Sequence, residues 1–243
     1  MQAWGLTDPG MVRSQNQDDY AIVKLGRDQL LAIVCDGMGG ARSGNIASRM
    51  AVEVFSDEVR RSVRFAMKQS RIDAMLRDAL ELANKAVYEQ SQLSEEYQGM
   101  GTTLVAALAL PGESYVINVG DSRCYLIENG MIRQVTVDHS LVQLLVDRGE
   151  ITVEEARRHP QKNLITRALG VESTVAFDLL RVETGQGSRL LLCSDGLSNV
   201  LPDPVLLQTS LEEREPEELC RRLVDMTLEQ GAPDNVTVVL AQM

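Results

Sequence analysis

The sequence has little of what marks a secreted, membrane-bound or nucleic-acid-binding protein. Only four cysteines occur in 243 residues, and no two of them stand at Cys-x-x-Cys spacing. All four lie in apolar runs, so we expect reduced, packed thiols rather than a disulfide framework. No apolar run approaches the roughly 20 residues that span a bilayer, and we expect no membrane contact.

Positive charge is also scarce. The chain has 24 Lys and Arg against 35 Asp and Glu, which gives a formal net charge of −11. Nucleic acids and anionic membranes require a positive contact surface, so neither is an expected partner. An acidic protein is better suited to gathering divalent cations. Residues 1–5 have neither the basic region nor the apolar core of a signal peptide, and we expect a cytoplasmic location.

The remaining composition is typical of a soluble folded protein. Hydrophobic residues make up 44% of the chain and charged residues 24%, and a chain of 243 residues can bury a substantial core. We expect a single domain over residues 1–243. No long apolar stripe is left over once the predicted helices are placed, so we also expect a monomer.

Apolar patterning predicts strands along most of the chain. The expected strands cover residues 2–7, 20–25, 30–35, 102–110, 115–119, 122–127, 132–135, 175–182, 189–193 and 236–240. Asn129 and Gly130 separate two of these strands and predict a tight hairpin, because both residues tolerate positive φ. The strands at 20–25 and 30–35 predict a second hairpin, whose far end is Asp36.

Helical spacing predicts two long amphipathic helices that pack on one face of a sheet. The first begins after Gly40 with Ser43 or Asn45 as its cap, and the second covers residues 72–93. A third helix is expected from Pro216, because proline is well accepted in a first helical turn.

The segment from Ser140 to Gly170 interrupts the strands. It predicts a short helix that Gly149 ends, and the sequence Thr152-Val153-Glu154-Glu155 has the form of a capping box that begins another. We expect this segment, about residues 140–170, to form a flap over a site.

Acidic residues stand at several strand boundaries: Asp36, Asp121, Asp195 and Asp234. Each one alone could be a turn residue, because Asp-Gly and Asp-Asn are common turn dipeptides. If these strand ends converge, the carboxylates repel one another and stay ionised only beside cations. Clustered oxygen ligands with few histidines favour Mg²⁺ or Mn²⁺ over zinc.

Three other features have a competing structural interpretation. His139 and His159 lie in or beside the flap with no second His or Cys at ligand spacing, which favours structural roles. The glycines at 37–40 could cradle a phosphate, but the dinucleotide pattern needs a third glycine where Arg42 stands. Arg13 is either a solvated arginine or a bidentate phosphate clamp.

Taken together, these residues resemble the metal-dependent protein phosphatases of type 2C, particularly the compact bacterial serine/threonine phosphatases. Each matching block alone is a weak pattern, but the blocks follow the family's order over nearly the whole chain. They are Arg13-Ser14-Gln15-Asn16-Gln17-Asp18, Asp36-Gly37-Met38-Gly39-Gly40, Gly99-Met100-Gly101-Thr102-Thr103, Gly120-Asp121-Ser122-Arg123, Thr166-Arg167-Ala168-Leu169-Gly170, Ser194-Asp195-Gly196 and Asp234-Asn235.

The resemblance implies an α+β fold, a four-layer α-β-β-α sandwich of two antiparallel sheets flanked by helices. It also implies a set of site residues in which Asp36 bridges two Mn²⁺ or Mg²⁺ ions. The other implied roles are the Gly37 carbonyl on one ion, Asp195 and Asp234 on the other, Asp18 acting through a water, Asp121 with Asp195 on a third ion, and Arg13 on the substrate phosphate.

The implied function is hydrolysis of phosphoserine and phosphothreonine in proteins by a water shared between the two ions. Such a signalling hydrolase would act on phosphorylated proteins and oppose a cognate bacterial serine/threonine kinase. Cys35 is not expected to be a nucleophile, because it lies in an apolar strand without a neighbouring base. The alternatives are a phosphatase specialised for one regulator, such as a phosphorylated anti-sigma antagonist, and a catalytically weak module that binds phosphoproteins.

One departure from the family concerns the acid that protonates the leaving group. Relatives commonly carry a histidine in or just after the Asp-Gly-x-Gly-Gly block, where this chain has Met38 and Ala41. Neither side chain can donate a proton, and general acid catalysis is typically worth ~10²–10⁴-fold. We therefore expect either that a metal-bound water protonates the serine or threonine oxygen, or that the enzyme is slow on alkyl phosphates and less affected on aryl phosphates.

Overall fold

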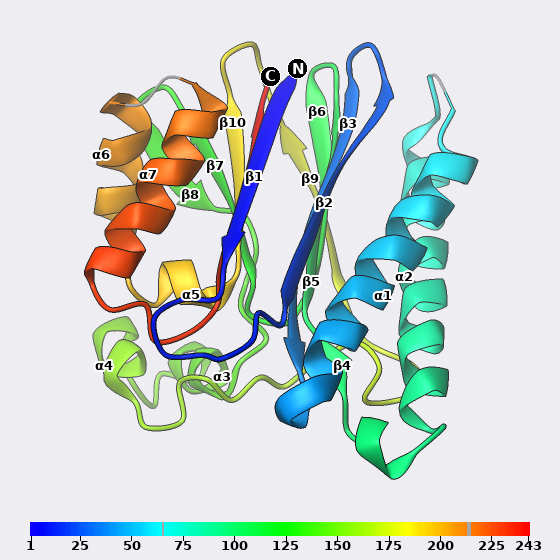
Figure 1. The fold of residues 1–243 in the computed structure, drawn as a ribbon. Coiled ribbons are helices and arrows are strands. Elements are labelled where there is room, and N and C mark those ends of the chain that lie inside the picture. The colour runs from blue at the N-terminus through cyan, green and yellow to red at the C-terminus, as the bar shows by residue number, and fades with distance from the viewer. Residues whose placement is uncertain (65, 213–214) are drawn as a thin grey trace.

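The computed structural model describes residues 1–64, 66–212 and 215–243, and the side chains of residues 40–42 lie outside the described part. Two antiparallel sheets face each other, and helices cover both outer faces (Figure 1). This arrangement confirms the predicted four-layer sandwich. Within the described residues, every helix is too short or too polar to cross a membrane.

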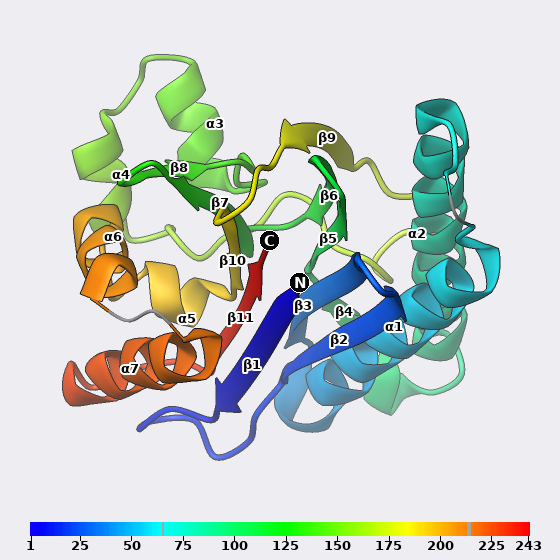
Figure 2. The same ribbon diagram turned by 90° about the horizontal axis from the view of Figure 1, so that it is seen from above.

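The first sheet contains both ends of the chain. Its strand order is β1 (Gln2–Asp8), β11 (Val236–Gln242), β10 (Arg189–Cys193), β7 (Arg123–Glu128) and β8 (Met131–Gln134). Three helices lie on its outer face: α5 (Asp195–Ser198), α6 (Asp203–Glu212) and α7 (Pro216–Glu229). The view from above shows these helices on one side of the sandwich (Figure 2).

The second sheet carries the two long helices. Its strand order is β2 (Asp18–Gly26), β3 (Gln29–Met38), β5 (Leu104–Leu110), β6 (Glu113–Val119) and β9 (Asp178–Glu183), and β4 (Gly101–Thr102) pairs with the end of β3. Helices α1 (Gly40–Ser62) and α2 (Gln69–Ser91) pack together on its outer face, followed by the short helix η1 (Glu95–Tyr97). The predicted flap contains α3 (Leu141–Asp147) and α4 (Val153–Arg158).

Strand β3 is apolar without interruption because both of its faces are buried. Leu31, Ile33 and Cys35 pack against α1 and α2, whereas Ala32 and Val34 point into the layer between the sheets. A strand that is covered on both sides has no polar alternation. The carboxylate of Asp36 therefore stands where this buried strand reaches the edge of the sandwich.

Most of the predicted elements are present, and several details were wrong: α2 begins three residues earlier than predicted, and the strand predicted over 102–110 is divided into β4 and β5. Helix α1 begins at Gly40 with Gly39 as its N-cap and no side-chain cap, and Ser43 instead donates its hydroxyl hydrogen to the Gly39 carbonyl. Strand β9 begins at Asp178, three residues later than predicted. Helices α5 and α6 were not predicted. The Asn129-Gly130 hairpin is confirmed, with φ of 51° and 73°.

Candidate metal centre

The predicted site residues come from distant parts of the sequence and meet at one end of the sandwich. An open pocket of about 540 Å³ lies there. Its lining includes six of the seven predicted residues: Arg13, Asp36, Gly37, Asp121, Asp195 and Asp234. The seventh, Asp18, lies beside this pocket on β2, directly opposite Asp36 in the β2–β3 register. The hairpin thus places two carboxylates at the same strand end.

Asp18 is a buried carboxylate in which only one of the two oxygens accepts hydrogen bonds from the described residues. Its Oδ2 accepts hydrogen bonds from the hydroxyls of Ser194 (2.7 Å) and Thr237 (2.6 Å). Its Oδ1 is buried and has no hydrogen-bond partner among the described residues. Removal from water is the main cause that raises the pKa of Asp18, to about 7. A buried, underused oxygen of this kind is a candidate for binding a cation or its water.

The backbone of Asp36 is held from both sides by two threonines. Its N–H donates to Thr103 Oγ1 (2.9 Å), and its carbonyl accepts from Thr102 Oγ1 (3.0 Å) and the Thr103 N–H (2.8 Å). Desolvation raises the pKa of Asp36 well above its ordinary value, and Asp18 and Asp195 raise it further. The carboxylates are therefore close enough to repel one another.

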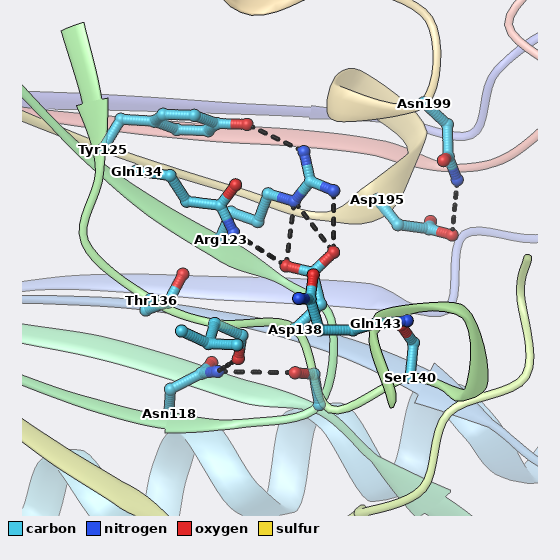
Figure 3. A network of polar contacts seen from close by, with 12 residues as sticks. Asn118, Arg123, Tyr125, Gln134, Thr136, Asp138, Ser140, Gln143, Asp195 and Asn199 are labelled. Atoms are coloured by element: carbon cyan, nitrogen blue, oxygen red, sulfur yellow. Dashed lines mark hydrogen bonds and ion pairs between the residues drawn. The ribbon is translucent and has the colours of Figure 1, made fainter. Parts of the chain in front are cut away.

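Asp195 is the first residue of α5 and is separated from the end of β10 by Ser194 alone. Its Oδ2 accepts a hydrogen bond from Asn199 Nδ2 (2.9 Å), one helical turn later (Figure 3). Burial raises the pKa of Asp195 to about 6, and Asp234 adds to this effect. Asp121, in the loop between β6 and β7, is buried, and its pKa is raised by desolvation and then by Asp195.

Arg13 contacts one of the predicted metal ligands. Its Nη2 donates to Asp234 Oδ2 at 2.7 Å, and its side chain is 54% exposed. The loop that carries Arg13 is fixed by Asn235, which donates to the carbonyls of Pro9 and Gln15 (both 2.9 Å) and accepts from the Gln17 N–H (2.8 Å). Sequence reasoning gave Asn235 no role, although it lies in the Asp234-Asn235 block.

Close packing explains the glycines beside Asp36. A Cβ at Gly37 would overlap the Gly44 carbonyl and lie 2.6 Å from the Gln17 carbonyl. Gly39 has φ of 125°, a conformation that side chains disfavour. Only glycine therefore lets α1 begin this close to the end of β3.

The donor set of this pocket fits Mg²⁺ or Mn²⁺. Among the described residues, no three Asp, Glu, His or Cys side chains are already gathered closely enough to hold an ion by themselves. The pocket nevertheless has Asp36, Asp121, Asp195 and Asp234 on its lining, with the underused Asp18 oxygen beside it. Oxygen donors without histidine or cysteine suit hard cations, and cations would relieve the repulsion that raises these pKa values.

A polar network fixes the chain that follows Asp121. Arg123 donates to both carboxylate oxygens of Asp138, through Nε (2.9 Å to Oδ1) and Nη2 (2.7 Å to Oδ2), and through Nη1 to Tyr125 (3.0 Å). Gln134 donates to Asp138 Oδ1 (2.9 Å) (Figure 3). A second pocket of about 400 Å³ lies between this network and the flap and shares Asp121 and Asp195 with the first.

The remaining sequence predictions concern residues around the pocket. Met38 lines it, whereas the Ala41 and Arg42 side chains lie outside the described residues. His139 and His159 do not line it, and His139 is buried at the base of the flap. Burial raises the pKa of the Cys35 thiol well above its ordinary value, which disfavours a thiolate nucleophile.

Comparison with known proteins gives a consistent result. The model of a family described as protein phosphatase 2C matches residues 12–240. The serine/threonine phosphatase stp of Listeria monocytogenes is 38% identical over 242 residues, which cover 100% of this chain and 96% of that protein. The serine/threonine protein phosphatase PstP of Mycobacterium tuberculosis is 39% identical over 98% of this chain and 44% of its own length.

Solved structures agree in fold. The serine/threonine phosphatase Stp1 from Staphylococcus aureus superposes with a TM-score of 0.92 and 35% identity, covering 100% of this chain and 94% of that one. The catalytic domain of PstP in complex with two manganese ions superposes with a TM-score of 0.86 and 35% identity, covering 99% and 97%.

Proposed function

The chain belongs to the protein phosphatase 2C family, and we propose that the carboxylates of its pocket hold the metal ions of a serine/threonine protein phosphatase. The family establishes the activity, which is metal-dependent hydrolysis of phosphoserine and phosphothreonine in proteins. The relatives do not favour the two alternatives, a phosphatase for one regulator and a weak binding module. The assignment of individual residues and ions is our proposal.

In this assignment Asp36 would hold two Mn²⁺ or Mg²⁺ ions. The Gly37 carbonyl would serve one ion, Asp195 and Asp234 would serve the other, and Asp18 would act through a water. Asp121 and Asp195 would hold a third ion. The observation that carries the assignment is the shared pocket, where four carboxylates from distant segments face one space.

The ions, when bound, lower the pKa of water and neutralise charge on phosphoryl oxygens. Arg13 binds the substrate phosphate, for which its planar guanidinium offers two parallel hydrogen bonds. To do so Arg13 exchanges its 2.7 Å contact with Asp234 for the phosphate, and its half-exposed side chain has room to move. Asn235 holds the Arg13 loop, and Asn199 holds the Asp195 carboxylate. Met38 has no proton to donate to the leaving group.

We further propose that residues 1–243 form one phosphatase domain in which residues 140–170 are a flap that contacts the substrate. The substrates are phosphorylated proteins, and the enzyme opposes a cognate serine/threonine kinase in the cytoplasm as a monomer. The acidic net charge of −11 supports a partner other than nucleic acid.

Phosphate release from a phosphothreonine peptide tests the assignment. The wild-type enzyme should require Mn²⁺ or Mg²⁺, and Asp234→Asn should lose more than about 100-fold in kcat/KM, because even groups outside the ligand shell of metal sites are worth 10–100-fold. Asp225→Asn is the matched control, since Asp225 is exposed on α7, and it should retain full activity. Full turnover by Asp234→Asn would refute the assignment.

A further inference from the structure

His139 lies where several parts of the structure meet at the entry to the flap. His139 is only 6% exposed, although histidine is a polar residue. The loop that carries Asp121, the two ends of the flap and the β9 strand all contact it. The site described above uses none of these contacts.

One side of the imidazole holds Gly120, the residue before Asp121. The ring nitrogen Nδ1 accepts from the Gly120 N–H (3.1 Å), and the backbone N–H of His139 donates to the Gly120 carbonyl (2.9 Å). A nitrogen that accepts from an amide carries no proton, so the ring is neutral with its hydrogen on Nε2. Gly120 has φ of 104°, and a Cβ there would lie 2.6 Å from Thr103 Cγ2. Glycine and histidine together therefore fix the backbone at this point.

The other side of the imidazole faces the exit of the flap and β9. Nε2 lies 3.2 Å from Asp178 Oδ2, and its hydrogen can be donated there. Arg167 Nη1 lies 3.0 Å from Nε2 and donates to Asp178 Oδ1 (3.3 Å), so the guanidinium and the Asp178 carboxylate both contact this side of the ring. The Thr166 N–H donates to the His139 carbonyl (2.7 Å). His139 thus connects the Gly120 backbone to the flap exit and to the second sheet.

Asp138 completes the arrangement from the preceding position. It accepts three hydrogen bonds from Arg123, which follows Asp121 by two residues (Figure 3). Two consecutive residues at the flap entry therefore hold Asp121 on both sides, Gly120 through His139 and Arg123 through Asp138. The next residue, Ser140, caps helix α3 of the flap.

We propose that His139 is a positioning residue that orients the Asp121 carboxylate for the third metal ion and ties that carboxylate to the base of the flap. The proposal rests on the metal role of Asp121 given above. Removing the acceptor at Nδ1 would leave the Gly120 N–H without its partner and loosen the peptide that precedes Asp121, while the backbone bond to the Gly120 carbonyl remains. Removing only the Nε2 contact would loosen the flap side and leave Gly120 held.

Two conservative substitutions separate the two ring nitrogens. Asparagine places an acceptor near the position of Nδ1, and glutamine places a donor near the position of Nε2. Isothermal titration of each metal-free protein with Mn²⁺ counts the ions and gives their affinities without reference to turnover. His139→Gln should lower the affinity for the third ion by about 10-fold, which is typical of groups that orient metal ligands. The affinity of His139→Asn for this ion should stay within about 3-fold of wild type. His159→Gln, in the same flap, is the control and should bind as wild type does.

A general loss of folding would lower the affinity for every ion in both variants. The proposal instead requires weaker binding of the third ion in His139→Gln and near-normal binding of that ion in His139→Asn. Equal behaviour of the two variants would overturn the proposal, as would a wild-type enzyme that binds only two ions. Either result leaves the two-ion phosphatase intact, whereas loss of all Mn²⁺-dependent phosphate release from wild type would refute the proposed function itself. A long-range ¹H–¹⁵N spectrum of the wild type supplies a test that needs no variant: His139 should be the neutral Nε2–H tautomer, and the Nδ1–H tautomer would overturn the proposal.

Discussion

Replacing Asp18 with asparagine should stabilise the metal-free enzyme at alkaline pH and weaken its response to Mn²⁺. The buried Asp18 carboxyl has a pKa of about 7 in the folded protein, against an ordinary value of 3.8. Because the folded pKa is raised, the folded state binds more protons than the unfolded chain between these values. Stability is therefore lost as pH rises through this window.

The magnitude follows from the two pKa values. At roughly 1.36 kcal/mol for each pKa unit, ionised Asp18 costs the folded protein about 4 kcal/mol at pH 8 and less than half of that at pH 5. Asparagine carries no charge, and its carbonyl can still accept from Ser194 and Thr237. Its amide group finds no obvious acceptor, which costs roughly 1–3 kcal/mol at every pH. The stability of Asp18→Asn relative to wild type should thus rise by roughly 3 kcal/mol between pH 5 and pH 8.

Urea unfolding in the presence of a chelator measures this difference at the two pH values. Asp225→Asn, on the exposed side of α7, is the control and should change stability equally at both. Added Mn²⁺ should then stabilise wild type more than Asp18→Asn, because a ligand stabilises only the state that binds it. A relative stability of Asp18→Asn that is the same at pH 5 and pH 8 would refute the reasoning that Asp18 is held ionised at a cost to the fold.

Three further substitutions test separate parts of the account. Arg13→Ala should lower kcat/KM on a phosphothreonine peptide by roughly 10–100-fold, as expected for loss of a charged hydrogen-bonding pair worth about 1.5–3 kcal/mol, and steady-state kinetics with undiminished turnover would contradict its phosphate-binding role. Gly37→Ala should destabilise the fold by at least about 1–3 kcal/mol in urea unfolding, because its methyl group would overlap the Gly44 carbonyl; unchanged stability would show that the backbone has room there. Ala41→His should raise turnover on the phosphothreonine peptide by up to ~10²-fold while p-nitrophenyl phosphate changes little, and an equal change on both substrates would argue against a missing general acid.

The strands and the long helices could be predicted from the sequence because their patterns are periodic and local. The buried β3 strand and the helices α1 and α2 have apolar spacings that survive in the structure. Helix α6 has no such apolar spacing, because its buried face includes Thr209 and Ser210. Helix α5 is a single turn of four residues and gives no periodic signal.

The aspartates of the pocket could be located from the sequence, but their partners could not. Strand ends followed by Asp-Gly identified Asp36 and Asp195, and the resemblance to a known family supplied the role of each residue. Asp18 lies opposite Asp36 because of the register of the β2–β3 hairpin, which the turn at residues 27–28 and the irregularity between Lys24 and Gly26 determine. Asn235 and His139 act through hydrogen bonds to backbone groups far along the chain, and no spacing in the sequence reveals such bonds.

In the proposed site, Asp36 contacts two metal ions in one pocket with Asp195 and Asp234. Anomalous diffraction at the manganese absorption edge, from crystals of the wild-type enzyme grown with Mn²⁺, locates these ions. We expect two strong peaks about 3.5–4 Å apart that both lie within bonding distance of Asp36 oxygens, with Asp195 and Asp234 beside one of them. Manganese peaks that lie away from Asp36, or a single peak that leaves Asp195 and Asp234 without a metal, would contradict the proposed site.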